Sequence, residues 1–215
     1  MRAIKSFMSR RAAIVTAIAA SALLVASCGG GGANAPADGD MSMGAAEGAK
    51  VTVVEYASVT CHVCANWHNA FWEEFKTKYV DTNKVRFVFR EIPTPPAPVA
   101  VAGFQIARCA GDDKYFDVVH ALMESQGEWQ TGGNPRDTLF RIGNGAGLTN
   151  SQIETCIKDP ESIKAADARA RAAVSAGVQG TPSFFVNGRQ IISPGSESGP
   201  TLNDISAAIE EELAK

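Results

Sequence analysis

Apolar positions recur with two different periods along this chain of 215 residues. Residues 51–56 are almost all apolar, which is typical of a strand that is covered on both faces of a sheet. Alternating apolar side chains predict a second strand over residues 84–90. Between them, aromatic residues recur at helical spacing over residues 65–80. This strand–helix–strand order predicts two parallel strands that are joined by a right-handed crossover.

A proline-rich stretch after the second strand changes the pattern. From there to about residue 176 the apolar spacing is helical, and clusters of Gly and Asn separate the segments. We expect an all-helical subdomain over residues 93–176, with helices over residues 99–110, 115–123, 136–142, 151–157 and 161–174. Gly132-Gly133-Asn134 and Gly143-Asn144-Gly145 are the expected helix stops.

Strand periodicity returns after the helical stretch. Two apolar runs, 183–186 and 190–192, flank Asn187-Gly188, which is a strong signal for a tight β-hairpin. Residues 202–213 place four aliphatic side chains on one stripe and predict a closing helix. Residues 50–92 and 177–215 therefore predict one α/β domain, interrupted by the helical subdomain.

The first 49 residues do not look like part of this domain. Residues 1–27 combine an N-terminal cluster of four basic residues with a short apolar stretch, which is typical of a secretory signal peptide. Val25-Ala26-Ser27-Cys28 resembles the lipobox of bacterial lipoproteins, in which the cysteine becomes the lipidated first residue. Ordinary signal cleavage, leaving a soluble protein, is the alternative. Residues 28–49 are rich in Gly and Ala and predict a flexible linker.

These features predict a location in the bacterial periplasm, with a lipid on Cys28 as the membrane tether. The chain has 20 basic and 23 acidic residues, and four of the basic ones lie within residues 1–27. The remainder is clearly acidic and has no basic patch, which excludes nucleic acid as an expected partner.

Cys61-His62-Val63-Cys64 carries the candidate chemistry, because it lies where the first strand meets the first helix. The positive end of the helix macrodipole favours a thiolate at Cys61. Cys64 lies one turn further on and can attack a mixed disulfide formed at Cys61. The alternative is a zinc site that includes His68, but the chain has no second ligand cluster, so we expect redox chemistry and no metal. We expect His68 to be a partly exposed helix residue.

Two further cysteines, Cys109 and Cys156, stand singly in the helical subdomain. In an oxidising compartment a remaining even pair favours a structural disulfide between them. Two buried free thiols are the alternative.

The stretches Val54-Glu55-Tyr56-Ala57-Ser58 and Val178 to Gly188, together with the cysteine pair, resemble the thioredoxin fold. The helical insertion narrows the resemblance to the DsbA family of exported thiol–disulfide oxidoreductases, and it covers the chain from about residue 50 onward. It implies an enzyme that introduces disulfides into folding proteins through Cys61 and Cys64. Such an enzyme needs no cofactor beyond that redox-active disulfide.

The resemblance also implies roles for single residues. It implies a cis peptide bond between Thr181 and Pro182 in a loop that packs against the cysteine pair. It also implies a substrate-binding surface made of Thr181, Pro182 and Val63, where the backbone of Thr181 pairs with a substrate peptide. Glu55 corresponds to a buried acid that manages the proton of Cys64. Members of the family often have His directly before the second cysteine, whereas here His62 follows Cys61, where an imidazolium still favours the thiolate.

The expected partners are unfolded or reduced exported proteins and a membrane protein that reoxidises the enzyme. The main alternative function is disulfide isomerase or reductase. Isomerases of this compartment commonly oligomerise through an N-terminal segment, which residues 29–49 are too short and polar to provide, so we expect a monomeric oxidase. A third possibility is a metal- or copper-binding thiol protein that uses Cys61, Cys64 and His62.

Overall fold

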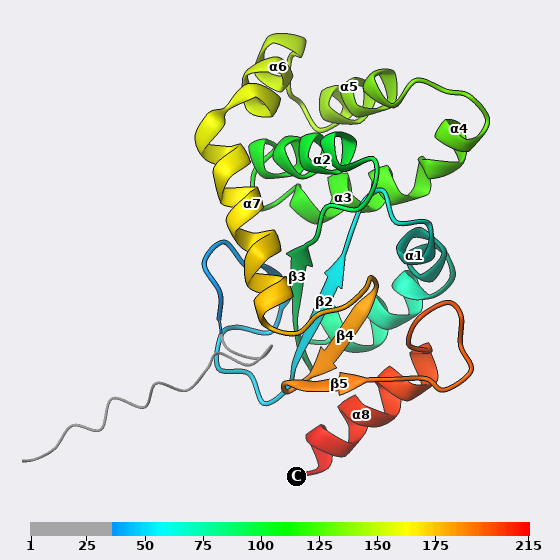
Figure 1. Ribbon diagram of the computed structural model, residues 1–215. Helices are drawn as coiled ribbons and strands as arrows, with labels where there is room; N and C mark the ends of the chain where they lie inside the picture. Colours follow the sequence, from blue (N-terminus) through cyan, green and yellow to red (C-terminus); the bar gives the residue numbers. More distant parts are fainter. Residues whose placement is uncertain (1–35) are drawn as a thin grey trace, which may run out of the picture. The chain divides into compact units, whose positions relative to one another are not determined.

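A five-stranded mixed sheet forms the centre of the computed structural model, which describes residues 36–215 (Figure 1). The strand order is β1-β3-β2-β4-β5. The β2–β3 pair is parallel, as the sequence predicts, whereas β1 with β3, β4 with β2 and β5 with β4 are antiparallel. The strands are β1 Met41–Gly44, β2 Thr52–Ala57, β3 Arg86–Glu91, β4 Ser183–Val186 and β5 Arg189–Ile191. The expected signal peptide 1–27, the lipidated Cys28 and the first residues of the expected linker lie outside the described residues.

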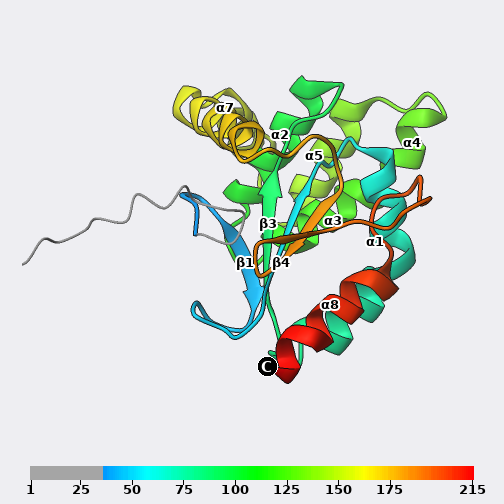
Figure 2. The same ribbon diagram turned by 60° about the horizontal axis from the view of Figure 1, so that its bottom comes forward.

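Helices cover both faces of the sheet, which explains why β2 is buried on both faces (Figure 2). Successive side chains of a strand point to opposite faces. Val53 belongs to the core cluster shared with α1 His62–Phe75 and α8 Leu202–Ala214. Val54 and Tyr56 belong to a smaller cluster on the other face, where α7 Pro160–Ser175 packs. Glu55 therefore points to the face that α1 covers. This direction brings its carboxylate close to the start of α1.

The residues between β3 and β4 are helical, as expected; α2 to α6 gather beyond the carboxyl ends of β2 and β3, and α7 runs back along the sheet (Figure 1). One short helix, α4, was not expected, because a single turn has no recognisable periodicity. In the described part of the chain, no helix has the length and apolar character that crossing a membrane requires. The helices before α7 are α2 Ala97–Cys109, α3 Tyr115–Glu124, α4 Gln126–Gln130, α5 Pro135–Gly145 and α6 Asn150–Lys158, and the π-helix Lys76–Val80 extends α1.

The expected helix stop at Gly143-Asn144-Gly145 is wrong, because α5 continues through these residues. Gly143 is a packing position: a Cβ atom there would lie 2.7 Å from Cδ1 of Ile153 on α6. The glycine therefore lets two helices approach closely. The turn that follows the helix depends instead on Gly147, whose φ of +96° favours glycine.

The flexible linker expected over residues 28–49 is also wrong in part, because Met41–Gly44 form strand β1. β1 pairs antiparallel with β3, and Met41 is 8% exposed. An ion pair of 2.8 Å between Arg90 on β3 and Asp40 fixes the residue before the strand. Backbone pairing with an otherwise open sheet edge needs little apolar sequence, so composition alone did not reveal it.

A buried carboxylate ties the helical subdomain to the sheet. Glu91, the last residue of β3, is 2% exposed. Its Oε1 accepts from Arg108 Nε of α2 at 2.7 Å and from Tyr115 Oη of α3 at 2.9 Å. Its Oε2 pairs with Arg169 of α7 at 2.8 Å. One carboxylate thus positions three helices relative to β3, because leaving it unpaired in the interior would be costly.

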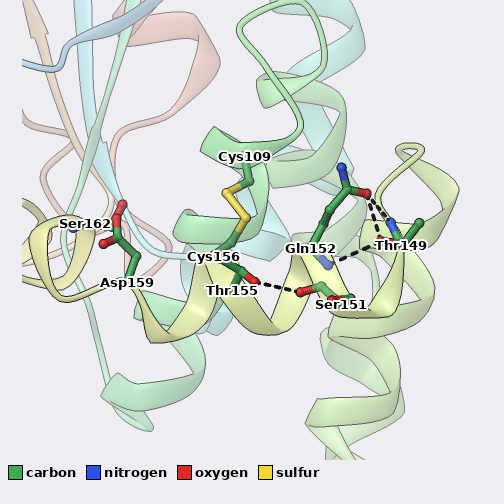
Figure 3. Close-up of a disulfide and its surroundings, with 8 residues drawn as sticks. All are labelled: Cys109, Thr149, Ser151, Gln152, Thr155, Cys156, Asp159 and Ser162. Carbon is green, nitrogen blue, oxygen red and sulfur yellow. Dashed lines mark hydrogen bonds between the residues drawn. A yellow bond between two sulfur atoms is a disulfide. The ribbon is translucent and has the colours of Figure 1, made fainter.

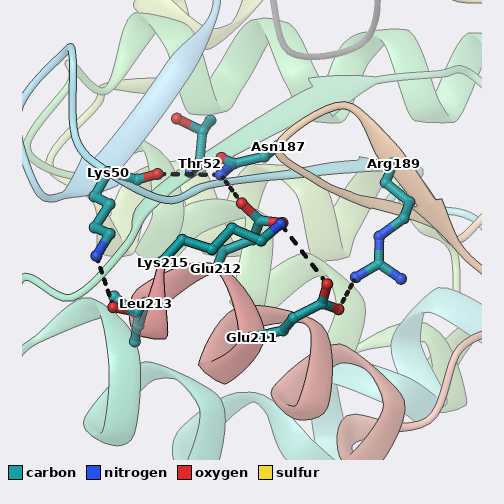
Figure 4. Close-up of polar contacts among 8 residues, drawn as sticks. All are labelled: Lys50, Thr52, Asn187, Arg189, Glu211, Glu212, Leu213 and Lys215. Atoms are coloured by element: carbon teal, nitrogen blue, oxygen red, sulfur yellow. Dashed lines mark hydrogen bonds and ion pairs between the residues drawn. The ribbon is translucent and has the colours of Figure 1, made fainter.

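The Asn187-Gly188 turn joins β4 to β5 with positive φ at both residues, as the hairpin signal predicts. Asn187 also connects the hairpin to neighbouring segments (Figure 4). Its Oδ1 accepts from the Thr52 amide at 2.9 Å, and its Nδ2 donates to Glu212 of α8 at 3.0 Å. The same side chain therefore links the hairpin, β2 and α8.

Cys109 and Cys156 are joined by a disulfide in the structure (Figure 3). It connects the last residue of α2 to α6, with the two Cα atoms 6.3 Å apart. The closed loop lies entirely within the helical subdomain, so the bond constrains that subdomain without touching the sheet.

Replacing both Cys109 and Cys156 by Ser should lower the free energy of unfolding by about 4 kcal/mol. The bond spans a sequence separation of 47 residues, and opening such a loop increases the entropy of the unfolded chain. Urea unfolding without reductant, of both proteins in a background where Cys61 and Cys64 are also replaced by Ser, measures the difference. A loss below about 1 kcal/mol would show that the bond does not constrain the unfolded chain in this way.

Candidate active site

Cys61 and Cys64 lie at the start of α1, immediately after the loop that follows β2. Cys61 is the N-cap residue, with φ −85° and ψ 113°, and its Sγ accepts a hydrogen bond of 3.2 Å from the Cys64 amide. The first sulfur thus takes the place of the side-chain oxygen that usually caps a helix. The two sulfurs are free and are not bonded to each other.

The two sulfurs have opposite acid–base properties. Cys61 is 9% exposed and Cys64 is fully buried. A hydrogen bond from the Cys64 side chain lowers the pKa of Cys61 to about 6, although burial acts in the other direction. Burial raises the pKa of Cys64, and the negative charges of Cys61 and Glu55 raise it further. At neutral pH these shifts favour a thiolate at Cys61 and a protonated thiol at Cys64.

The Thr181–Pro182 loop lies against the first sulfur. Its peptide bond is cis, and the Cys61 thiol donates to the Thr181 carbonyl at 3.4 Å. Pro182 is buried and Thr181 is half-buried. Gly199, with φ +77°, passes so close that a Cβ atom there would lie 3.0 Å from Pro182 Cγ. The loop is thus held between the cysteine pair and the segment before α8.

Two groups of residues that the sequence did not reveal hold the loop before Cys61. Ser58, Thr60 and Thr94 share hydrogen bonds, including Thr60 Oγ1 to the Thr94 carbonyl at 2.8 Å. Gln126, the first residue of α4, is 5% exposed and donates to the carbonyls of Val59 at 2.8 Å and Cys61 at 3.2 Å. The helical subdomain therefore contacts the active-site loop directly. A lone Gln separated by 65 residues from its partner gives no sequence signal.

Glu55 is fully buried, and its partner is His68. Both carboxylate oxygens lie 3.0 Å from His68 Nε2. The expectation that His68 is partly exposed is wrong, because it is 4% exposed and faces the sheet from α1. The carboxylate explains this burial, since a polar ring can leave water only with a hydrogen-bond partner.

The other two candidate residues, His62 and Val63, lie beside the cysteines and make fewer polar contacts. His62 is exposed at the first position of α1, and within residues 36–215 its side chain makes no hydrogen bond. Val63 is half-buried and packs against the core. The structure thus brings Cys61, Cys64, Glu55 and the Thr181–Pro182 loop together. Over the part of the chain that the structure describes, no group of three or more His, Cys, Asp or Glu side chains is arranged to hold a metal.

The sheet, the dithiol at the start of α1 and the cis proline loop beside it define a thioredoxin-type redox domain. Residues 37–211 match the family described as Thioredoxin, and the chain belongs to that family. A relative named putative protein-disulfide oxidoreductase, from Rickettsia bellii, is 34% identical over 178 residues. The match covers 82% of this chain and 65% of the relative, so the chain spans less than two thirds of that protein.

Two solved structures share the fold together with its helical insertion. Alpha-DsbA1 from Wolbachia pipientis superposes with a TM-score of 0.71 at 23% identity, and the match covers 83% of this chain and 93% of that chain. Oxidised BdbD from Bacillus subtilis gives a TM-score of 0.71 at 18% identity, covering 86% of this chain and 98% of that chain. The thioredoxin fold with an inserted helical subdomain and the DsbA resemblance expected from the sequence are thereby confirmed.

Alkylation of Cys61 by iodoacetamide should accelerate as the pH rises through about 6, because that is the pKa of the thiol. In Cys64→Ala the midpoint should move upward, since the hydrogen bond that contributes most to the lowered pKa is lost. Mass spectrometry of the peptide that contains Cys61 separates its reaction from that of other thiols. An identical midpoint in the variant would contradict the role of Cys64.

Proposed function

We propose that the protein is an exported thiol–disulfide oxidoreductase that introduces disulfides into folding proteins. The contrast between the two sulfurs carries the proposal. A thiolate at Cys61 beside a protonated Cys64 stabilises the reduced form, and a stable reduced form makes the corresponding disulfide a good oxidant.

The reaction starts from the Cys61–Cys64 disulfide. A substrate thiolate attacks the sulfur of Cys61, the more exposed of the two, and the bond to Cys64 breaks. Cys64 leaves as a thiolate and takes up a proton, which Glu55 supplies. A second substrate thiolate then attacks the substrate sulfur of the mixed disulfide. The substrate is released as a disulfide, and the enzyme is left with two reduced cysteines.

The Thr181–Pro182 loop binds the substrate chain in this proposal. An extended peptide that pairs with the backbone of Thr181 adds a strand beside the active site. The Thr181 carbonyl lies 3.4 Å from the Cys61 sulfur, so a paired substrate places its own cysteine close to the nucleophile. Val63, half-buried beside Cys61, and the exposed His62 form the rim on the other side.

The proposed location and partners of the enzyme are inferred from its sequence. Residues 1–28 support export to the periplasm and lipid attachment at Cys28. An exported oxidase needs a membrane redox partner that restores its disulfide. Reduced exported proteins are the substrates, and the enzyme acts as a monomer.

Cys61→Ser should abolish oxidation of a reduced, unfolded substrate protein, because the nucleophile is lost. Cys64→Ser, given a substrate that already contains a disulfide, should instead accumulate mixed disulfides: Cys61 attacks the substrate disulfide, one substrate thiol leaves, and the thiol that would resolve the product is missing. The Cys109→Ser, Cys156→Ser double variant is the control and should retain turnover at a temperature where it remains folded. Retained oxidation by Cys61→Ser would refute the assigned roles. Faster turnover of a substrate with scrambled disulfides than of a reduced one would indicate an isomerase.

A further inference from the structure

The Glu55–His68 pair continues toward the surface on the side away from the cysteines. His68 uses Nε2 to contact Glu55, while its Nδ1 is buried without a hydrogen-bond partner. This ring lines a depression of about 350 Å³, together with Asn69, Glu73, His120 and Glu124. A buried, unpartnered polar atom in a ring that lines a depression with other polar groups is a position where water can complete the hydrogen bonds.

His120 on α3 provides a second ring in the same depression. Its centroid lies 6.1 Å from that of His68, and its Nδ1 also lacks a partner. On its outer side, Nε2 lies 3.3 Å from Oε1 of Glu124, whose side chain is 59% exposed. Both rings line the same depression and each has an unpartnered Nδ1, so a water between the rings can complete their hydrogen bonds. The second ring is connected to solvent through the carboxylate of Glu124.

We propose that Glu55, His68 and His120 form a path that carries the proton of Cys64 to and from solvent. The inference rests on the proposed thiol–disulfide exchange and extends it, because that exchange requires Cys64 to lose and regain a proton in each cycle. His68 and His120 act through Glu55 and are positioning residues.

The proton balance can be written for the loss of the Cys64 proton. The S–H bond of Cys64 breaks, and its proton goes to the carboxylate of Glu55. Glu55 passes a proton to Nε2 of His68, and that ring releases its Nδ1 proton through water to Nδ1 of His120. His120 then passes a proton from Nε2 to Glu124 or directly to water. One proton leaves Cys64 and one reaches solvent, and uptake follows the reverse order.

The surrounding charges suit this direction of transfer. Burial lowers the pKa of His120, so that its ring is neutral and can accept a proton at neutral pH. The charges of Glu124, Glu73 and Asp117 favour the protonated ring, and they lie on both helices that border the depression. A positive charge on His68 opposes one on His120, which limits how long both rings hold protons.

A purely structural role for the two rings is the competing explanation. His68 stacks on Trp72 with centroids 5.1 Å apart, so its replacement can disturb packing. His120 is the better position to change, because its side chain is 24% exposed. His120→Ala enlarges the depression at its solvent side and makes room for free imidazole. Asn69→Ala changes the lining of the same depression without removing a titratable group.

The test follows the attack of Cys64 on a mixed disulfide between Cys61 and glutathione, measured by the release of glutathione in a stopped-flow experiment. In His120→Ala this step should be at least tenfold slower at about pH 6, and the deficit should shrink toward about pH 9, where hydroxide can take the proton directly. Added imidazole should restore most of the rate, and Asn69→Ala should behave like the wild type. His68→Gln should show the same pH-dependent deficit if it remains folded.

An unchanged rate in His120→Ala, or a deficit that is equal at all pH values and is not rescued by imidazole, would overturn the proton path. Both outcomes leave the proposed function intact, because the mixed disulfide still forms and resolves. Failure of the wild type to form or resolve the mixed disulfide would instead refute the thiol–disulfide exchange itself. The two failures are therefore distinguishable in one experiment.

Discussion

The hydrogen bond from the Cys64 amide to the Cys61 sulfur is the constraint on which the site depends. It makes a cysteine the cap of α1, with φ −85° and ψ 113°, and it fixes the sulfur at the positive end of the helix. Because β2 points at this helix start, its Glu55 reaches the space behind Cys64. The Thr181 carbonyl holds the sulfur from the opposite side at 3.4 Å. In this placement the hydrogen bond from the Cys64 side chain lowers the pKa of Cys61, and burial raises the pKa of Cys64.

The helical subdomain supports the site through polar contacts. Gln126 binds the carbonyls of Val59 and Cys61, and Glu91 anchors three helices to the end of β3. His120 adds a titratable ring from α3 beside the buried pair on α1 and β2. The helical subdomain therefore both holds the active-site loop in place and, in the proposed proton path, connects the buried pair to solvent.

Most of the elements could be predicted from the sequence, because their apolar positions follow a clear period. Residues 51–56 and 202–213 are examples, and the helix and strand at these places lie within a residue of the expected ends. Among the features that could not be predicted, three depend on contacts between residues that are distant in the sequence. β1 depends on pairing with the edge of β3, the continuation of α5 depends on the contact of Gly143 with α6, and the burial of His68 depends on Glu55. Each of these is decided by a residue distant in the sequence, so no local pattern contains it.

The reduction potential of the Cys61–Cys64 pair tests the central claim most directly. A thiolate stabilised at the start of α1 favours the reduced form, so the pair should be oxidising, with a potential more positive than roughly −200 mV. Equilibration with glutathione buffers, followed by quantifying the two thiols, gives this value. A potential near that of thioredoxin, roughly −270 mV, would contradict an oxidase in which the placement of Cys61 sets the direction of the reaction.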